Sequence, residues 1–195
     1  MKLTKHEHAC VVVEKDGASF VIDPGSFSRD AAGVISGAEA ILLTHEHFDH
    51  VHEAAIKEAL AARPGLRVYA PAALAGAFDA GQFTAVSAGD ELAIAGFTVT
   101  VHGGTHAVIH PDIPAIANVG YLVDGTVYHP GDAYFVPDAA VETLCAAILK
   151  APRPAILGVK EYVKTAPDMA VYGAVEFARN LHATVNSSGE MRRKH

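Results

Sequence analysis

The segment Thr44-His45-Glu46-His47-Phe48-Asp49-His50 carries four potential metal ligands within six residues, its three histidines and its aspartate. It follows directly on the apolar run Ile41–Leu43, which is typical of a buried β-strand. Side chains alternate between the two faces of an extended chain, so His45 and His47 are expected to point the same way. Two imidazoles at this spacing can hold one metal ion.

The last two residues of the segment, Asp49 and His50, stand where the chain is expected to turn into a helix over 53–63. From there they can reach a second metal close to the first. Imidazole and carboxylate ligands together suit zinc, iron, manganese or nickel, without selecting one of them. The segment therefore predicts a site for one or two divalent metals.

One cluster cannot fill two coordination spheres, so further ligands must come from other strand ends. The expected loop over 102–114 offers His102, His106 and His110. We favour His106, because it lies closest to the strand end behind two glycines. His110 lies further out and is expected to face the substrate, and His102 is a weaker alternative.

A second distant source of ligands is the run His129-Pro130-Gly131-Asp132, at the end of another expected strand. An aspartate that follows a glycine-containing break can present both carboxylate oxygens. We therefore expect Asp132 to bridge two metals.

The wider pattern mixes strands, hairpins and helices. Asp16-Gly17 and Asp124-Gly125 each join two apolar runs, a pattern typical of β-hairpins. Helices are expected over 53–63, 71–78, 139–149 and 168–181. Such a mixture favours stacked layers, with helices covering mixed sheets, in a single domain over 1–195.

Composition excludes several classes of protein. Half of the 195 residues are hydrophobic and 19% are charged, which is not a disordered composition. The net charge of −7 argues against nucleic acid or an anionic membrane as a partner. Cys10 and Cys145 cannot build a disulfide framework, and no apolar run is long enough to span a bilayer. We expect a cytoplasmic protein acting on a small molecule, and a homo-oligomer is compatible with these features.

The quoted segment matches the HxHxDH signature of the metallo-β-lactamase superfamily. His8-Ala9, Ile22-Asp23-Pro24-Gly25 and His129–Asp132 fall in the order that the family shows, so the resemblance covers about two-thirds of the chain. Within the superfamily the chain looks most similar to the L-ascorbate-6-phosphate lactonase-like branch. The segments HAVIHPDIP (106–114) and NVGYLVDG (118–125) carry that finer resemblance.

The resemblance implies an α/β fold, an αββα sandwich of two mixed sheets with the metals at one edge. It implies that His45, His47 and His106 hold the first metal, that Asp49 and His50 hold the second, and that Asp132 bridges. The expected metal is Zn²⁺, as one or two ions, with Mn²⁺ or iron as alternatives. Metal-activated water would then attack a small ester, lactone or phosphate ester.

The resemblance also implies roles for residues around the metals. Asp49 and Asp132 are the expected catalytic carboxylates, with Asp49 orienting the attacking water. Asp23 is expected to accept the N–H of a ligand histidine. His8, His110 and His129 are expected to line the substrate pocket, and Tyr121 and Tyr128 to belong to the core.

The chain departs from the family near its C-terminus. Members usually supply one more histidine there, but residues 146–195 contain only His182 and His195. Three readings stay open: His182 serves from a shifted position, the second site is weak or empty, or the segment is altered relative to a working ancestor. A metal-binding protein that no longer turns over is therefore the alternative to a hydrolase.

Overall fold

The computed structural model describes residues 1–108, 112–133, 135, 137–139 and 141. The chain divides into two compact units, one of residues 1–106 and 116–141 and one of residues 107–115 and 142–195. The elements and the site below all belong to the first unit. The predicted helices over 139–149 and 168–181, the divergent segment 146–195, His110 and His182 fall on, or extend into, residues outside those described. The single domain over 1–195 stays a prediction.

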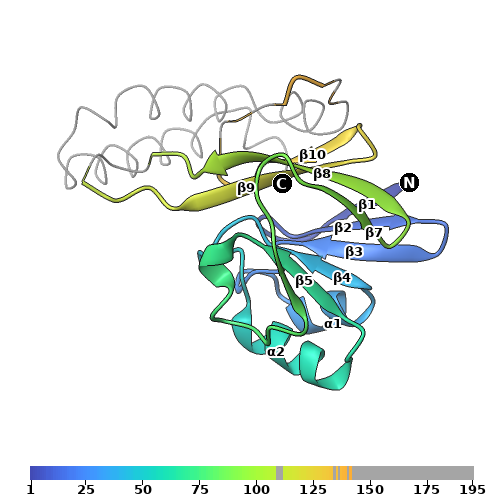
Figure 1. The fold of residues 1–195 in the computed structure, drawn as a ribbon. Coiled ribbons are helices and arrows are strands. Elements are labelled where there is room, and N and C mark those ends of the chain that lie inside the picture. The colour runs from blue at the N-terminus through green and yellow to red at the C-terminus, as the bar shows by residue number, and fades with distance from the viewer. Residues whose placement is uncertain (109–111, 134, 136, 140, 142–195) are drawn as a thin grey trace, which may run out of the picture. The chain divides into compact units, whose positions relative to one another are not determined.

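Ten strands form two sheets in the described part of the chain (Figure 1). The first sheet runs antiparallel from its first to its third strand and parallel from there on. In spatial order its strands are β1 (Lys2–Lys5), β2 (Val11–Lys15), β3 (Ala18–Ile22), β4 (Ala40–Leu42), β5 (Arg67–Ala70) and β6 (Phe83–Ala85). The second sheet is antiparallel throughout. Its spatial order is β10 (Val127–His129), β9 (Ala117–Val123), β8 (Phe97–Thr105) and β7 (Glu91–Ile94).

Both predicted hairpins are confirmed. The first turn joins β2 to β3 through Asp16 and Gly17, at φ values of 54° and 87°. The second joins β9 to β10 through Asp124 and Gly125, at 46° and 68°. Aspartate and glycine enter this left-handed region more easily than most residues, which is why the D-G pairs predicted these turns.

The predicted helix over 53–63 is confirmed as α2 (Glu53–Ala62), and α1 (Ala31–Ser36) is a short helix that the sequence pattern did not suggest. The helix predicted over 71–78 is wrong: only the single 3₁₀ turn η1 (Ala72–Leu74) forms, since Gly76 is a poor residue for continuing a helix. The loop predicted from residue 102 is also wrong at its start, because β8 continues to Thr105, paired with Ala117 of β9.

None of the described helices is long and apolar enough to cross a bilayer.

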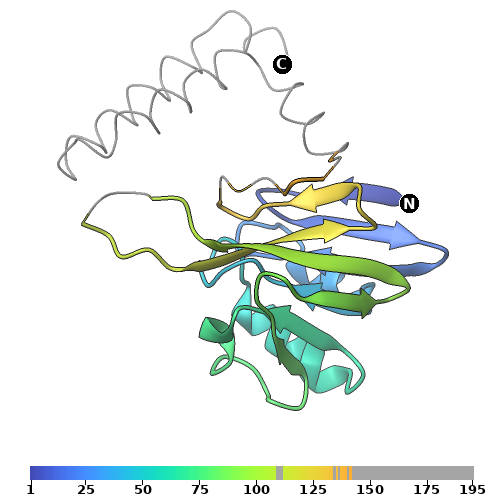
Figure 2. The same cartoon turned by 45° about the horizontal axis from the view of Figure 1, so that its top comes forward.

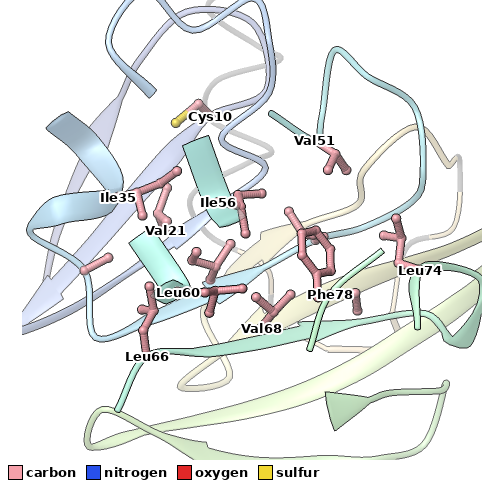
Figure 3. Packing of buried hydrophobic residues seen from close by; sticks show 14 residues of the cluster. Cys10, Val21, Ile35, Val51, Ile56, Leu60, Leu66, Val68, Leu74 and Phe78 are labelled. Carbon is pink, nitrogen blue, oxygen red and sulfur yellow. The ribbon is translucent and has the colours of Figure 1, made fainter. Parts of the chain in front are cut away.

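Two apolar clusters separate three layers: the helices, the first sheet and the second sheet. Figure 2 shows the helices and the two sheets from a second direction. In the first cluster, Ile35 of α1 and Ile56 and Leu60 of α2 pack on one face of the first sheet (Figure 3). Phe20 and Phe97 meet in the second cluster, between the sheets, with ring centroids 4.9 Å apart. Neighbouring residues of β3 and β4 alternate between the clusters, as the period of a strand requires. A helix layer beyond the second sheet would fall on residues outside those described.

Tyr121 and Tyr128 are buried, as predicted. Tyr121 of β9 joins the two sheets, because its hydroxyl donates to the carbonyl oxygen of Leu43 at 2.8 Å and lies 3.1 Å from the carbonyl oxygen of Tyr69. Leu43 is the residue before the metal-ligand segment. This hydrogen bond therefore holds the start of that segment against the second sheet.

Candidate metal centre

The predicted metal ligands, all of which lie among the described residues, gather at one edge of the two sheets. Asp23 directly follows β3, and Thr44 lies two residues after the end of β4. These two strands run parallel. The second sheet supplies His106 after β8 and Asp132 after β10. The ends of four strands thus bring together residues that are far apart in the sequence.

His45, His47 and His106 form the first group of potential ligands, with their ligand atoms all within 4.8 Å of one another. His45 Nε2 and His47 Nδ1 are 3.1 Å apart, close to the roughly 3.3 Å expected for two nitrogens on one tetrahedral zinc ion. The expected extended chain is wrong here: residues 44–46 form a bend, and this bend turns the two imidazoles toward each other. His102 lies outside the group, with its Nε2 2.9 Å from Thr100 Oγ1.

Two further groups adjoin the first. His8, Asp49 and His50 form one, and His45, His50 and Asp132 form the other. Asp132 Oδ1 lies 3.3 Å from His50 Nε2, and its Oδ2 lies 3.6 Å from His106 Nε2. The two oxygens face different histidines, which is the placement that a bridging carboxylate requires. Metal ligation by these residues stays a prediction, but their side chains do converge.

Asp23 is a fully buried carboxylate that organises the cluster from behind. Its oxygens accept hydrogen bonds from Thr44 N at 2.8 Å, Thr44 Oγ1 at 2.7 Å and His50 Nδ1 at 2.7 Å. Burial is the largest single influence and disfavours its charge. The hydrogen bonds from His50 and Thr44, together with the charges of His129 and His50, outweigh burial and lower the pKa of Asp23. With its Nδ1 proton held by Asp23, the imidazole of His50 directs Nε2 into the cluster.

Thr44 plays the matching part for His45, and the sequence pattern did not single it out. The Thr44 hydroxyl has one proton, which it donates to Asp23. It therefore accepts from His45 Nδ1, 2.9 Å away, and the lone pair of His45 Nε2 faces the cluster. One buried carboxylate thus orients His50 directly and His45 through a hydroxyl.

The donor set fits a divalent metal. His50 is 1% exposed, and among the described residues its Nε2 has no hydrogen-bond partner. Asp132 Oδ1 stands at an ion-pair distance from this nitrogen, but not in hydrogen-bond geometry. Buried polar atoms are rarely left without a partner, and a bound cation would supply one.

The electrostatics of the cluster set two of its histidines apart. Burial opposes a charge on His50, but the carboxylates of Asp132 and Asp23 raise the pKa of its imidazole to about 10. Burial and the neighbouring His50 lower the pKa of His45 to about 4. The His50 imidazolium in turn holds the pKa of the Asp132 carboxyl well below its usual range. In the metal-free fold at neutral pH, His50 is therefore protonated and His45 is neutral.

Metal uptake at pH 7 is expected to release a proton from His50 and none from His45, since a metal can bind only the unprotonated nitrogen. The contribution of His50 should strengthen apparent metal affinity by about tenfold per pH unit, up to its pKa of about 10. Calorimetric titrations in buffers of different ionisation enthalpy count the released protons. A His50→Asn variant that releases as many protons as the natural protein would contradict the expectation.

Two residues fix the loop that carries Asp132. The Asn118 side chain is buried, donates to the Pro130 carbonyl at 2.9 Å and accepts from Asp132 N at 3.0 Å. The sequence pattern did not assign it a role. His129, whose place on the pocket wall stays a prediction, has both ring nitrogens bonded to backbone: Nε2 donates to Ala9 O at 2.9 Å and Nδ1 accepts from Gly131 N at 3.2 Å. It therefore ties the Asp132 loop to the turn that carries His8.

Gly25 lies against the metal-ligand segment with no space for a side chain. A Cβ there would stand 1.7 Å from the Asp49 carbonyl oxygen and 2.6 Å from His50 N. We expect Gly25→Ala to destabilise the fold by about 3 kcal/mol, because the backbone beside it must move. It should also displace Asp49 and His50 and weaken metal binding. Urea unfolding checks this against Gly65→Ala, where a Cβ meets nothing within 4 Å; equal stability of the two variants would refute it.

Comparison with known proteins identifies a matching family and several relatives. The sequence profile described as the Beta-lactamase superfamily domain matches residues 2–167. Protein Rv0786c of Mycobacterium tuberculosis is 40% identical over 177 residues, covering 88% of this chain and 82% of that protein. A UPF0173 metal-dependent hydrolase of Myxococcus xanthus is 34% identical over 142 residues, covering 64% of this chain and 50% of the relative. The chain thus spans most of the first relative and half of the second.

Solved structures show the same fold at low identity. A protein of Parabacteroides distasonis described as a candidate metal-dependent hydrolase has a TM-score of 0.54 and 21% identity, covering 75% of this chain and 74% of its own. CmlA of Streptomyces venezuelae, a diiron β-hydroxylase, also has a TM-score of 0.54, with 20% identity and coverage of 78% and 32%. Because these two proteins are described by different chemistries, the fold by itself does not specify the reaction.

Proposed function

Because this chain belongs to the β-lactamase superfamily, with a metallo-β-lactamase fold, we propose that it is a metal-dependent hydrolase of a small ester, lactone or phosphate ester. The observation that carries the proposal is the convergence of three overlapping ligand groups at one sheet edge, with Asp132 between them. Relatives that bear the name metal-dependent hydrolase support it. We propose zinc as the metal and the L-ascorbate-6-phosphate lactonase-like branch as the nearest group.

The residues of the cluster would have different roles in such a reaction. His45, His47 and His106 would hold one ion, and Asp49 and His50 would hold a second, with Asp132 shared. When bound, such a pair lowers the pKa of water toward about 7 and polarises the reacting carbonyl or phosphoryl oxygen. Asp49, 22% exposed, would orient the attacking water. Asp23 and Thr44 keep the imidazoles in the required tautomers from behind.

Two exposed aromatic side chains stand beside the cluster and suggest how a substrate is held. Phe48, between two ligand residues in the sequence, is 64% exposed and packs edge-on against Phe27, which is 53% exposed. Phe27 in turn contacts the ring of His8, with centroids 5.4 Å apart. Apolar side chains at the rim of a polar site are typical of ligand-binding pockets, so we assign them the apolar part of the substrate.

The variant Phe48→Ala is expected to raise KM by about tenfold, corresponding to roughly 1.4 kcal/mol of lost contact. Its kcat and thermal stability should change little, because the ring is exposed and lies outside the ligand groups. Steady-state kinetics separate the two parameters. An unchanged KM would remove the ring from the substrate site.

The decisive experiment measures turnover of a panel of esters, lactones and phosphodiesters before and after chelation, and again after zinc, manganese or iron is returned. We expect activity to disappear with the metal and to return with it. Turnover that survives complete metal removal would refute the proposal. Tightly bound metal with no turnover of any panel member would favour the alternative, a metal-binding protein that no longer catalyses.

A further inference from the structure

We propose that His8 is a further protein ligand of the second metal site, beside Asp49, His50 and the shared Asp132. The proposal rests on the metal dependence proposed above and makes it more specific. It gives the second site a ligand from the N-terminal turn, where the family resemblance implies a histidine late in the chain. The sequence pattern placed His8 only on the pocket wall.

The geometry places Asp49 between two imidazoles. Asp49 Oδ2 lies 2.9 Å from His8 Nε2 and 4.0 Å from His50 Nε2. The rings of His8 and His50 meet edge to face, with centroids 5.1 Å apart. One ligand atom from each of the three residues lies within 4.8 Å of the other two. A single ion can therefore be reached by all three side chains.

The second, independent observation is the buried nitrogen of His50. Its Nδ1 is satisfied by Asp23, whereas its Nε2 has no hydrogen-bond partner among the described residues. A buried nitrogen in this state costs free energy that a correctly placed partner would recover. Of the carboxylates near it, Asp132 also lies 3.6 Å from His106 Nε2 of the first group, whereas Asp49 lies 2.9 Å from His8.

The backbone around His8 is held in an uncommon conformation that presents this side chain. Its φ is +52°, a left-handed value that costs a residue with a side chain about 1–2 kcal/mol. Several bonds hold the turn: Lys5 Nζ contacts the His6 and His8 carbonyl oxygens, and His6 N donates to Cys10 O at 2.9 Å. His129 adds a bond to the Ala9 carbonyl oxygen from the opposite sheet. Strained backbone held by this many contacts is typical of functional positions.

The chemistry of the three ligands suits the ion. Two imidazoles and one carboxylate are a donor set for zinc, manganese or iron. His8 is more exposed than His50, with 35% of its side chain accessible against 1%, so the outer side of this group faces solvent.

The test is a metal titration of the full-length apoprotein with Zn²⁺ or Co²⁺, followed by calorimetry and by metal analysis after dialysis. The key variant is His8→Asn, because asparagine adopts left-handed backbone readily but lacks an imidazole. We expect the natural protein to bind two ions. The variant should keep the first ion at unchanged affinity and bind the second more than about 100-fold more weakly. His6→Asn, two residues away and outside every ligand group, is the matched control and should behave like the natural protein.

Three results would overturn the inference. They are a second ion bound equally tightly by His8→Asn, a natural protein that binds one ion only, and loss of the second ion in His182→Asn but not in His8→Asn. If far-UV circular dichroism shows that His8→Asn is misfolded, His8→Asp replaces it, since aspartate keeps both the backbone preference and a donor oxygen. The second ion should then persist in His8→Asp, and its loss from a folded variant would also count against the proposal.

The readout separates this inference from the proposed function. Two ions with the expected His8 dependence, but no turnover of any panel member, would refute the hydrolase and leave the His8 site standing. Metal-dependent turnover, with a second ion that binds His8→Asn as tightly as the natural protein, would support the hydrolase and refute the His8 site.

Discussion

Replacing His47 with alanine is expected to reduce kcat/KM by more than about 100-fold. Removing a residue that only supports a metal ligand typically costs about 10- to 100-fold, and loss of a direct ligand should cost more. His47 belongs only to the first ligand group, with His45 and His106, so the variant removes one of three donors to that ion. Its side chain is half-buried rather than part of either apolar cluster, so the fold should persist. Kinetics and metal analysis of the same preparation measure both effects.

The matched control for His47 is His52→Ala. His52 lies five residues further on and caps α2, its Nδ1 accepting a hydrogen bond from Ala55 N at 3.3 Å. Loss of this cap should lower the free energy of unfolding by about 1 kcal/mol and leave metal content and turnover unchanged. A His47→Ala protein with full metal content and full turnover would remove the first group from the mechanism.

Asp23→Asn is expected to destabilise the metal-free protein at pH 7 by roughly 3 kcal/mol, because it breaks a buried, hydrogen-bonded charge pair with His50. It should also weaken metal binding, since an amide cannot serve all three donors that the carboxylate now accepts. The pKa of Asp23 is lowered in the fold, so its stabilising effect is present above the ordinary carboxyl pKa. The effect is lost as the pH falls through the lowered pKa, and the difference between the two proteins should shrink in acid.

Asp16→Asn supplies the control for Asp23. Both aspartates sit at positive φ, 54° for Asp16 and 49° for Asp23, but Asp16 is exposed in the first hairpin turn. Its substitution should change stability by no more than about 0.5 kcal/mol. Urea unfolding of both variants between pH 7 and pH 3 makes the comparison. Equal stability of the two variants at neutral pH would show that Asp23 does not organise the cluster.

Much of the fold was predictable because its signals are local. The D-G turns, the apolar runs on either side and the amphipathic stretch over 53–63 each depend on neighbours in the chain. One error arose where a distant partner overrides local preference. β8 runs on through Gly103 and Gly104 because β9 pairs with it, although the glycines by themselves favour a loop.

The site divides in the same way. His45, His47, Asp49 and His50 were predictable as a group because only a few residues of chain separate them. The roles of Asn118 and Thr44 were not, because each depends on hydrogen bonds that the pairing of strands creates. His129 was expected to contact substrate, and its two backbone bonds became visible only once the loops it joins were placed in space.

The sequence by itself therefore determined the family and the segment that carries the predicted metal ligands, since those ligands are neighbours in the chain. His106 and Asp132 were predicted from their places at strand ends, but only the tertiary structure brings them and His8 beside residues 45–50. His106 and Asp132 reach these residues because β3, β4, β8 and β10 end at the same edge of two packed sheets, and His8 reaches them from the turn between β1 and β2. Spacing along the chain does not encode that approach. It depends on strand order, register and the packing of one sheet on the other.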